Sequence, residues 1–144
     1  MITVRKCVLP DAEMLCRLNT EVMKYPYPFE DTVRLLEKLI GDARHGIFIA
    51  EYEGQIAGYI HLHDYQTLYF VPMKNILCLA VFPEYRRKGV GSALLAAAEQ
   101  WAKETGAAGI RLDSGEERLP AHACYEKAGY SARKMHKNFV KRFS

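Results

Sequence analysis

The chain has 144 residues, and 49% of them are hydrophobic, which is enough to fill the core of one compact domain spanning residues 1–144. A formal net charge of +3 is too small to indicate nucleic acid binding, and the basic residues near the C-terminus are expected on a solvated strand face. The sequence shows neither an uninterrupted apolar run of about 18 residues nor the apolar segment of a signal peptide, so we expect a cytoplasmic protein that does not act at a membrane.

The first forty residues predict one strand and two helices. Residues 2–6 alternate like a strand, and Pro10 with Asp11 opens a helix whose apolar spacing continues to residue 23. A second helix is expected after Asp31, whose carboxylate can cap the backbone from Thr32 onward.

The middle of the chain predicts three strands. Residues 46–52 and 55–63 lie on either side of Glu53 and Gly54, which is typical of a hairpin. Residues 75–82 form a third apolar strand, and it leads into the most informative segment of the sequence.

A basic turn with two glycines follows this strand. Arg86, Arg87 and Lys88 precede Gly89 and Gly91, and an alanine-rich helix begins near the first glycine and ends at residues 105–106. The first N–H groups of a helix and the positive end of its dipole attract anions, and glycine lets a phosphate approach the backbone. We therefore expect this turn to hold a phosphate or diphosphate mainly through main-chain N–H groups.

Two familiar phosphate-binding patterns fit the turn poorly. A P-loop carries its lysine after the second glycine, whereas Lys88 precedes both glycines. A dinucleotide fingerprint needs glycine or alanine where Leu94 stands, although Asp113 lies at the distance of its ribose-binding acid.

The remaining pattern, Arg-x-x-Gly-x-Gly directly after a strand, spans residues 86–91 and resembles the acyl-CoA turn of the GNAT N-acetyltransferase superfamily. Residues 121–130 resemble that family's Ala-x-x-x-Tyr-Glu-Lys-x-Gly-Phe/Tyr signature. The two motifs cover residues 75–143, about half of the chain. Residues 118–125 are also similar to a segment of small-amine acetyltransferases, including aminoalkylphosphonate acetyltransferases.

This resemblance implies an α/β fold. Its central sheet would be mixed and mostly antiparallel, with six to seven strands and about four flanking helices. Residues 110–113 supply one later strand, Gly129 closes the last helix in a left-handed conformation, and two C-terminal strands complete the sheet. The sheet would splay open between the strand before the phosphate turn and the strand at residues 110–113, where ligands bind at the carboxyl ends of strands.

The resemblance also implies acetyl-CoA as the co-substrate. Its pantetheine arm would pair with the strand before the turn, its diphosphate would rest on the turn, and the N–H of Val81 would stabilise the oxyanion. The expected acetyl-CoA-binding residues are Leu79, Ala80, Val81, Arg86, Arg87, Lys88, Gly89, Val90, Gly91, Ser92 and Ser114.

Tyr125 falls where relatives place the tyrosine that faces the thiol, so the resemblance implies that it protonates the leaving thiolate. Its helical spacing with Ala121 and Ala128 fits an ordinary core tyrosine equally well.

The general base is the point at which this sequence departs from its relatives. Many of them carry Glu or Asp on the strand before the turn, whereas residues 75–79 contain no carboxylate. His61 and His63 share one strand face and could contact the substrate or relay a proton, and water could do the same. A metal is not expected, because this pair lacks a recognisable third ligand and the four cysteines are scattered as reduced thiols.

Aromatic residues in two predicted loops are candidates for the acceptor site. Tyr27 and Phe29 lie between the first two helices, and Tyr69 lies before the strand that leads to the phosphate turn. The same residues could instead cover the core or form a homodimer contact.

We therefore expect an N-acetyltransferase that moves an acetyl group from acetyl-CoA to a primary amine of a small molecule, amino acid or peptide. The amine would attack directly in a ternary complex. The alternative is a CoA-binding sensor or regulatory module that has kept the phosphate turn and lost its acid–base residues.

Overall fold

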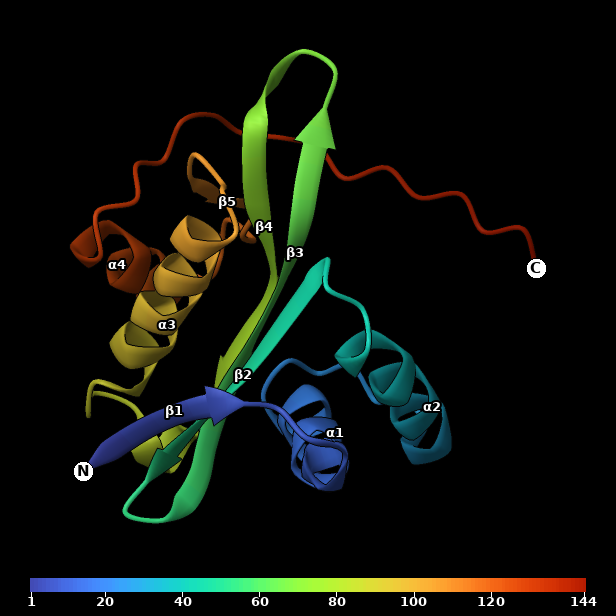
Figure 1. The fold of residues 1–144 in the computed structure, drawn as a ribbon, viewed down its shortest axis with the longest axis vertical. Helices are drawn as coiled ribbons and strands as arrows, with labels where there is room; N and C mark the ends of the chain where they lie inside the picture. Colours follow the sequence, from blue (N-terminus) through green and yellow to red (C-terminus); the bar gives the residue numbers. More distant parts are fainter. The chain divides into compact units, whose positions relative to one another are not determined.

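The computed structural model describes residues 1–144, which form two compact units, residues 1–113 and 114–144 (Figure 1). Short 3-10 turns lie at Leu9–Asp11 and Pro83–Tyr85. The first unit contains β1 (Ile2–Lys6), α1 (Ala12–Glu21), α2 (Phe29–Ile40), β2 (His45–Tyr52), β3 (Gln55–Thr67), β4 (Phe70–Val81), α3 (Val90–Glu104) and β5 (Ile110–Leu112). The second contains α4 (Leu119–Lys127), and no helix in the chain is both long and apolar enough to cross a bilayer.

The strands form one mixed sheet in the order β1-β2-β3-β4-β5. The first three pairings are antiparallel, and β4 pairs with β5 in parallel. The predicted class and the four α-helices are confirmed, but the predicted six to seven strands are wrong, because the sheet has five.

The missing strands are the predicted closing pair. Residues 130–144 form no strand, and residues 131–144 are exposed throughout (Figure 1). Alternation of apolar and polar residues favours a pleated backbone, but a strand also needs a neighbouring strand to pair with.

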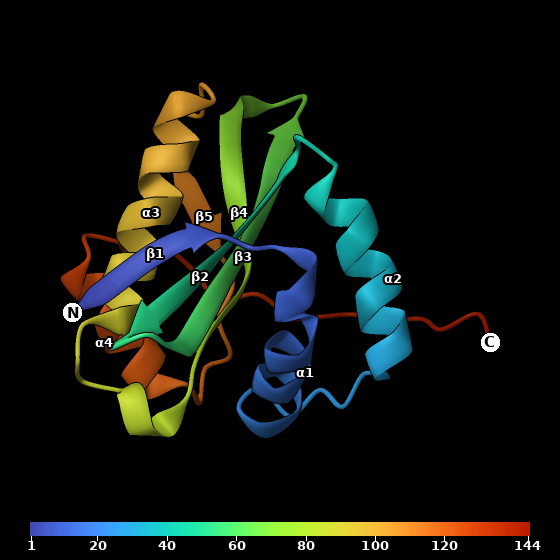
Figure 2. The ribbon, with the colours of Figure 1, turned by 60° about the horizontal axis from the view of Figure 1, so that its bottom comes forward.

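Helices cover both faces of the sheet in the first unit (Figure 2). Leu18 of α1 and Leu36 of α2 pack in one core cluster with Tyr59 of β3. On the opposite face, the ring of Phe48 in β2 contacts the ring of Trp101 in α3, with centroids 6.3 Å apart. Two-residue alternation along each strand therefore decides which side chains face α1 and α2 and which face α3.

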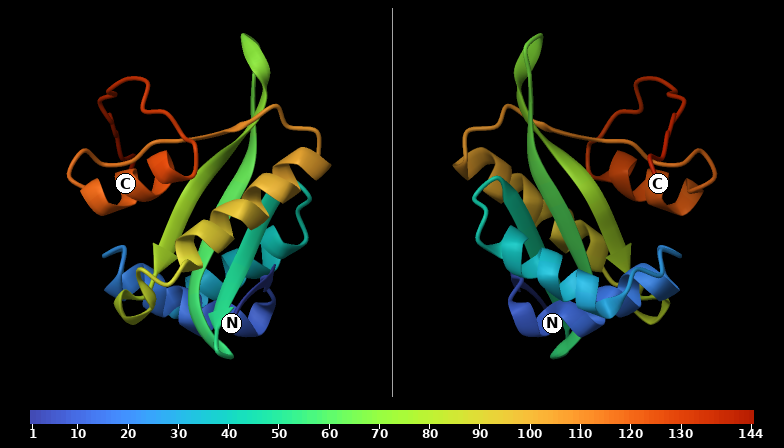
Figure 3. Two further views of the ribbon diagram at one scale, coloured as in Figure 1. Left: turned by 90° about the vertical axis from the view of Figure 1, so that its left-hand side faces the viewer. Right: turned by 90° about the vertical axis from the view of Figure 1, so that its right-hand side faces the viewer.

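Two predicted element boundaries are corrected by the structure. The second helix begins at Phe29 rather than after Asp31, because the N–H of Thr32 donates to the carbonyl of Pro28 at 3.0 Å. The predicted loop at residues 65–70 is instead a continuous hairpin of β3 and β4 with its turn at residues 68–69, and this hairpin projects from the sheet (Figure 3).

A close approach between β3 and β4 requires glycine at position 58. A Cβ atom on Gly58 would lie 2.5 Å from the carbonyl oxygen of Ala80, well inside van der Waals contact. The absence of a side chain at this position therefore brings β3 close to the part of β4 that leads into the phosphate turn.

Candidate active site

The sheet opens along one edge of β4. β5 pairs only with residues 74–76 of β4, and Leu77 is then an extra residue, because His61 pairs with Cys78 and Leu62 pairs with Ile76. A bulge of this kind bends and twists the strand. Beyond it, residues 79–81 pair with β3 alone, so their other edge is open in the sheet, as the sequence predicts.

One hydrogen bond shows to which side the N–H and C=O groups at the end of β4 point. The N–H of Phe82 donates to the carbonyl of Ala57 at 2.9 Å, which points it toward the β3 side. Because antiparallel strands alternate their hydrogen-bonding direction, the backbone of Ala80 also faces β3, whereas the N–H and C=O groups of Leu79 and Val81 face the open edge.

The predicted phosphate turn ends in a helix N-terminus. Gly89 precedes α3 with a φ angle of 89°, a left-handed conformation that favours glycine. The first N–H that bonds back to this turn is that of Ala93, which donates to the carbonyl of Gly89 at 3.0 Å. The three preceding N–H groups, in residues 90–92, therefore have no helical carbonyl to bond.

Three cations border this helix N-terminus. Arg86, Arg87 and Lys88 are exposed, and none of them forms an ion pair within the chain. The ammonium of Lys88 lies 5.5 Å from the ring centroid of Tyr52. Side chains with unpaired positive charge, beside N–H groups that have no carbonyl partner, can bind the oxygens of a diphosphate.

Two predicted residues lie in the second unit. The Ser114 hydroxyl oxygen is buried and has no hydrogen-bond partner. Tyr125 is the buried residue of α4, and its ring centroid lies 6.1 Å from that of Tyr130. The N–H of Tyr130 donates to the carbonyl of Tyr125 at 2.9 Å, with Gly129 at a φ angle of 97°, so the helix closes at the predicted glycine.

A row of polar residues crosses four strands of the first unit. His45 of β2 pairs in register with His63 of β3, His63 pairs with Asn75 of β4, and Asn75 pairs with Arg111 of β5. By alternation from Tyr59, the histidines of β3 lie on the face that α1 and α2 cover. The sequence singled out His61 and His63 but not His45 or Arg111.

Hydrogen bonds connect this row. Nδ1 of His45 lies 3.0 Å from Nε2 of His61, and the amide nitrogen of Asn75 lies 3.1 Å from Nε2 of His63. The amide oxygen of Asn75 accepts a hydrogen bond from Arg111 at 2.5 Å.

Partial burial favours the neutral form of His61 and His63. Loss of solvation, together with the nearby His45 and His63, lowers the pKa of His61 from 6.5 to about 4. Burial also lowers the pKa of His63. At neutral pH each of these rings therefore has one nitrogen free of a proton and able to accept one.

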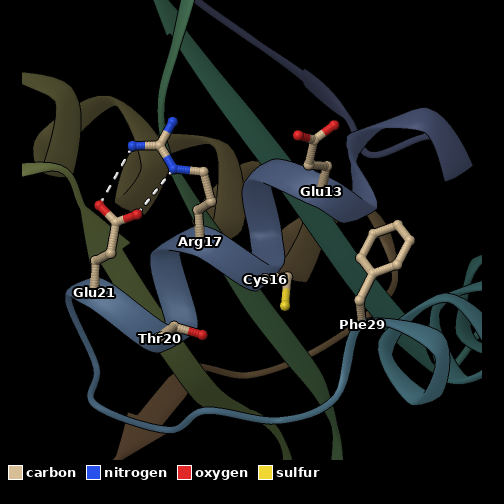
Figure 4. Close-up of a pocket in the computed structure, with 6 residues that line it drawn as sticks. All are labelled: Glu13, Cys16, Arg17, Thr20, Glu21 and Phe29. Carbon is tan, nitrogen blue, oxygen red and sulfur yellow. Dashed lines mark hydrogen bonds and ion pairs between the residues drawn. The ribbon is translucent and has the colours of Figure 1, made fainter.

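A cavity of about 240 Å³ lies between α1 and the start of α2 (Figure 4). Arg17 pairs with Glu21 at its rim, with Nε 2.9 Å from a carboxylate oxygen. The same Arg17 lies over the ring of Phe82, 5.1 Å from its centroid, so this side of α1 lies beside the end of β4. The lining residues are Glu13, Cys16, Arg17, Thr20, Glu21 and Phe29.

The cavity includes part of the predicted acceptor loop. Phe29 lines it, and the carbonyl of Tyr27 accepts a hydrogen bond from the thiol of Cys16 at 3.5 Å. Tyr69, in contrast, sits in the β3–β4 turn and is 81% exposed. At ~3.3 Å per strand residue it lies roughly 30 Å along β4 from Leu79. The structure does not bring Tyr69 to the other candidate residues.

Comparison with known proteins agrees with this architecture. Residues 12–130 match the Acetyltransferase (GNAT) family. The chain is 27% identical over 146 residues to an N-alpha-acetyltransferase of Sulfurisphaera tokodaii, covering 94% of this chain and 84% of that protein. It is 35% identical over 89 residues to the aminoalkylphosphonate N-acetyltransferase of Salmonella typhimurium, covering 61% of this chain and 56% of that protein.

The fold also matches a solved enzyme. The structure of AAC(6')-Iy with the bisubstrate analogue CoA-S-monomethyl-acetylneamine superposes with a TM-score of 0.87 at 18% identity, covering 99% of both chains. A likeness at this identity concerns the fold, whereas the family match covers most of the sequence, including the phosphate turn and α4. The chain therefore belongs to the GNAT acetyltransferase family.

Proposed function

We propose that this protein transfers an acetyl group from acetyl-CoA to a primary amine of a small molecule or peptide end, by direct attack in a ternary complex. Membership of the family makes the chain an acyltransferase. The observation that supports acetyl-CoA as donor is the conjunction of an open β4 edge with an open helix N-terminus at the end of the same strand.

The residues of the first unit fit the two ends of coenzyme A. The N–H and C=O groups of Leu79 and Val81 can pair with the amides of a pantetheine arm as a further strand would. At the end of β4, the N–H groups from Gly89 to Ser92 and three unpaired cations can hold the diphosphate. The resemblance to the family also assigns Ser114, in the second unit, to acetyl-CoA, and its hydroxyl has no hydrogen-bond partner within the chain.

Three tasks remain for the protein during transfer. An alkylammonium with a pKa near 10.4 must lose a proton, which costs roughly 4 kcal/mol at neutral pH. The N–H of Val81, already directed at the open edge, would donate to the oxygen on which negative charge develops. Tyr125 would return a proton to the departing sulfur.

The cavity between α1 and α2 is the proposed acceptor pocket. Glu13 and Glu21 give its wall two carboxylates against the single guanidinium of Arg17, and Phe29 adds an aromatic surface. This balance favours a cationic amine over an anionic acceptor. Its volume of about 240 Å³ suits a small amine or the first residue of a peptide.

A thiol-release screen tests the proposal. Purified protein with acetyl-CoA is offered alkylamines, amino acids, aminophosphonates, aminoglycosides and short peptides, and free CoA is measured. We expect amine-dependent release that a Glu13→Gln variant reduces by raising KM. Acetyl-CoA binding without release for any amine would instead favour a CoA-binding regulatory module, and no binding at all would overturn the proposal.

A further inference from the structure

The polar row across β2, β3, β4 and β5 lies on the sheet face that α1 and α2 cover. Further along the same face, Ile49, Tyr59 and Ala80 pack against α1 and α2. On the same face, β3 presents His61 and His63, two and four residues beyond Tyr59, and β2 presents His45, four residues before Ile49. Imidazole nitrogens are costly to remove from water without partners, and the nitrogens of these half-buried rings contact one another or Asn75.

The innermost ring lies beside the open edge of β4. His61 pairs in register with Cys78, the residue before Leu79, so only one strand spacing separates it from the open edge. His45 lies on the next strand away from β4, and its Nδ1 is 3.0 Å from Nε2 of His61, so a proton can pass between the two rings. His45 and His63 are stacked, with ring centroids 5.6 Å apart.

The bonding pattern favours proton transfer over metal binding. Three ring nitrogens that a metal would need are already in contact with other groups: Nδ1 of His45 with Nε2 of His61, and Nε2 of His63 with Asn75. Asn75 is held in turn by Arg111, which also pairs with Asp113 at 2.8 Å. The row therefore fixes the orientation of the imidazoles.

From this geometry we infer that His61 and His45 form a two-membered relay that carries the proton of the acceptor ammonium away from β4, with His63 and Asn75 as positioning residues. The inference rests on the proposed N-acetyltransferase function. It supplies the proton acceptor that β4 itself lacks, since residues 75–79 contain no carboxylate.

One proton of the acceptor ammonium leaves through the two imidazoles. The ammonium N–H bond breaks as Nδ1 of His61 takes the proton, while the proton on Nε2 of His61 passes to Nδ1 of His45. His45 releases its own Nε2 proton to water. The freed amine attacks the thioester carbon, and the C–S bond breaks with its electrons on sulfur. Tyr125 gives its phenol proton to that sulfur, and the second amine proton restores the phenol. One proton per turnover leaves through the relay, and both imidazoles, which then carry their proton on Nδ1, return to the starting tautomer by proton exchange with water.

The charged and titratable groups around the relay come from five segments. Asp42 interacts electrostatically with His45, Asp64 with His63, and the histidines with one another. From α2 the apolar Leu36 packs into the core of this face. The groups near the relay that can affect the pH dependence of kcat/KM are Asp42, His45, His61, His63, Asp64, Cys78, Arg111 and Asp113.

The test compares two acceptors that differ only in amine basicity. The best acceptor of the thiol-release screen is paired with its analogue fluorinated beside the amine, which is largely neutral at pH 7. For His61→Gln at pH 7 we expect kcat/KM to fall about 100-fold with the basic amine and to change less than about threefold with the fluorinated one. Raising the pH toward the pKa of the basic amine should restore most of the loss.

Controls separate this inference from the function on which it rests. His45→Gln repeats the test if His61→Gln folds poorly, and His136→Gln in the exposed C-terminal segment is the matched control. Equal losses of kcat/KM with both amines, or no loss with either, would overturn the relay. The proposed function would still stand in that case, because the unmodified protein releases thiol. If the unmodified protein binds acetyl-CoA but the screen finds no amine that it acetylates, both proposals fail.

Discussion

The side-chain amide nitrogen of Asn75 lies 3.1 Å from Nε2 of His63. This contact ties the strand on which many GNAT enzymes carry a carboxylate to a histidine on the neighbouring strand. Because Arg111 holds the other end of the same amide, Asn75 cannot rotate without losing two hydrogen bonds. The position is structurally fixed, and the proton-accepting groups nearest to it are imidazoles.

Replacing Gly89 should weaken coenzyme A binding. A residue with a Cβ atom at a φ angle of 89° costs about 1–2 kcal/mol, so Gly89→Ala should either strain the turn or shift the N–H groups of α3. We expect the Kd for CoA, measured by calorimetry, to rise about tenfold. Gly54→Ala is the matched control, because Gly54 has a φ angle of 82° in the β2–β3 turn. Equal Kd values for the two variants would contradict this role of Gly89.

Tyr125→Phe should reduce kcat and leave acetyl-CoA binding nearly unchanged. In the proposed mechanism this phenol protonates the departing sulfur, so we expect its removal to cost about 10- to 100-fold in kcat. Tyr130→Phe, a change in the aromatic neighbour of Tyr125, should have little effect on kcat. A similar kcat for both variants would remove Tyr125 from the mechanism.

The sequence predicted the part of the site that depends on local backbone chemistry. Gly89 and the start of α3 follow from residue types within one turn, and the structure has the glycine in the expected left-handed conformation. The opening beside Leu79 was also expected, and a bulge at Leu77 accounts for it in the structure.

His45 could not be found because a β-bulge sets its register. Tyr52 pairs with Gln55, and an unbroken hairpin from that pair would place His45 opposite Leu62. The register shift near Ala50 instead places His45 opposite His63, on the same face. A slip of one residue moves a side chain to the other side of a sheet, and nothing in the sequence marks this one.

Breaking the Arg5–Asp11 pair should destabilise the fold. Asp11 is 5% exposed and accepts hydrogen bonds from Arg5 at 2.8 and 2.9 Å and from the N–H of Val8 at 2.9 Å. Burial acts to raise the pKa of Asp11, but these bonds outweigh it and lower the pKa. We expect Asp11→Asn to cost about 3 kcal/mol in urea unfolding.

The exposed pair of Arg17 and Glu21 provides the comparison for that measurement. Both side chains are about half exposed, so Glu21→Gln should cost less than about 0.5 kcal/mol. Equal costs for Asp11→Asn and Glu21→Gln would show that the buried pair contributes no more than a surface one.

His61 should make stability depend on pH. Its pKa falls from 6.5 to about 4 on folding, so the unfolded chain binds more protons between these values. The free energy of unfolding should therefore fall as the pH drops from 6.5 toward 4, by about 3 kcal/mol from this residue. The check is the difference between the unmodified protein and His61→Gln in urea unfolding at several pH values. A difference that stays constant with pH would contradict a neutral, buried His61.

The central claim is that main-chain N–H groups at the start of α3 hold the diphosphate of coenzyme A. Titration of 15N-labelled protein with CoA, followed by NMR, tests it most directly. The account predicts that the amide signals of residues 87–92 shift most, together with those of Leu79 and Val81. Saturation with CoA that leaves the signals of residues 87–92 in place would contradict it.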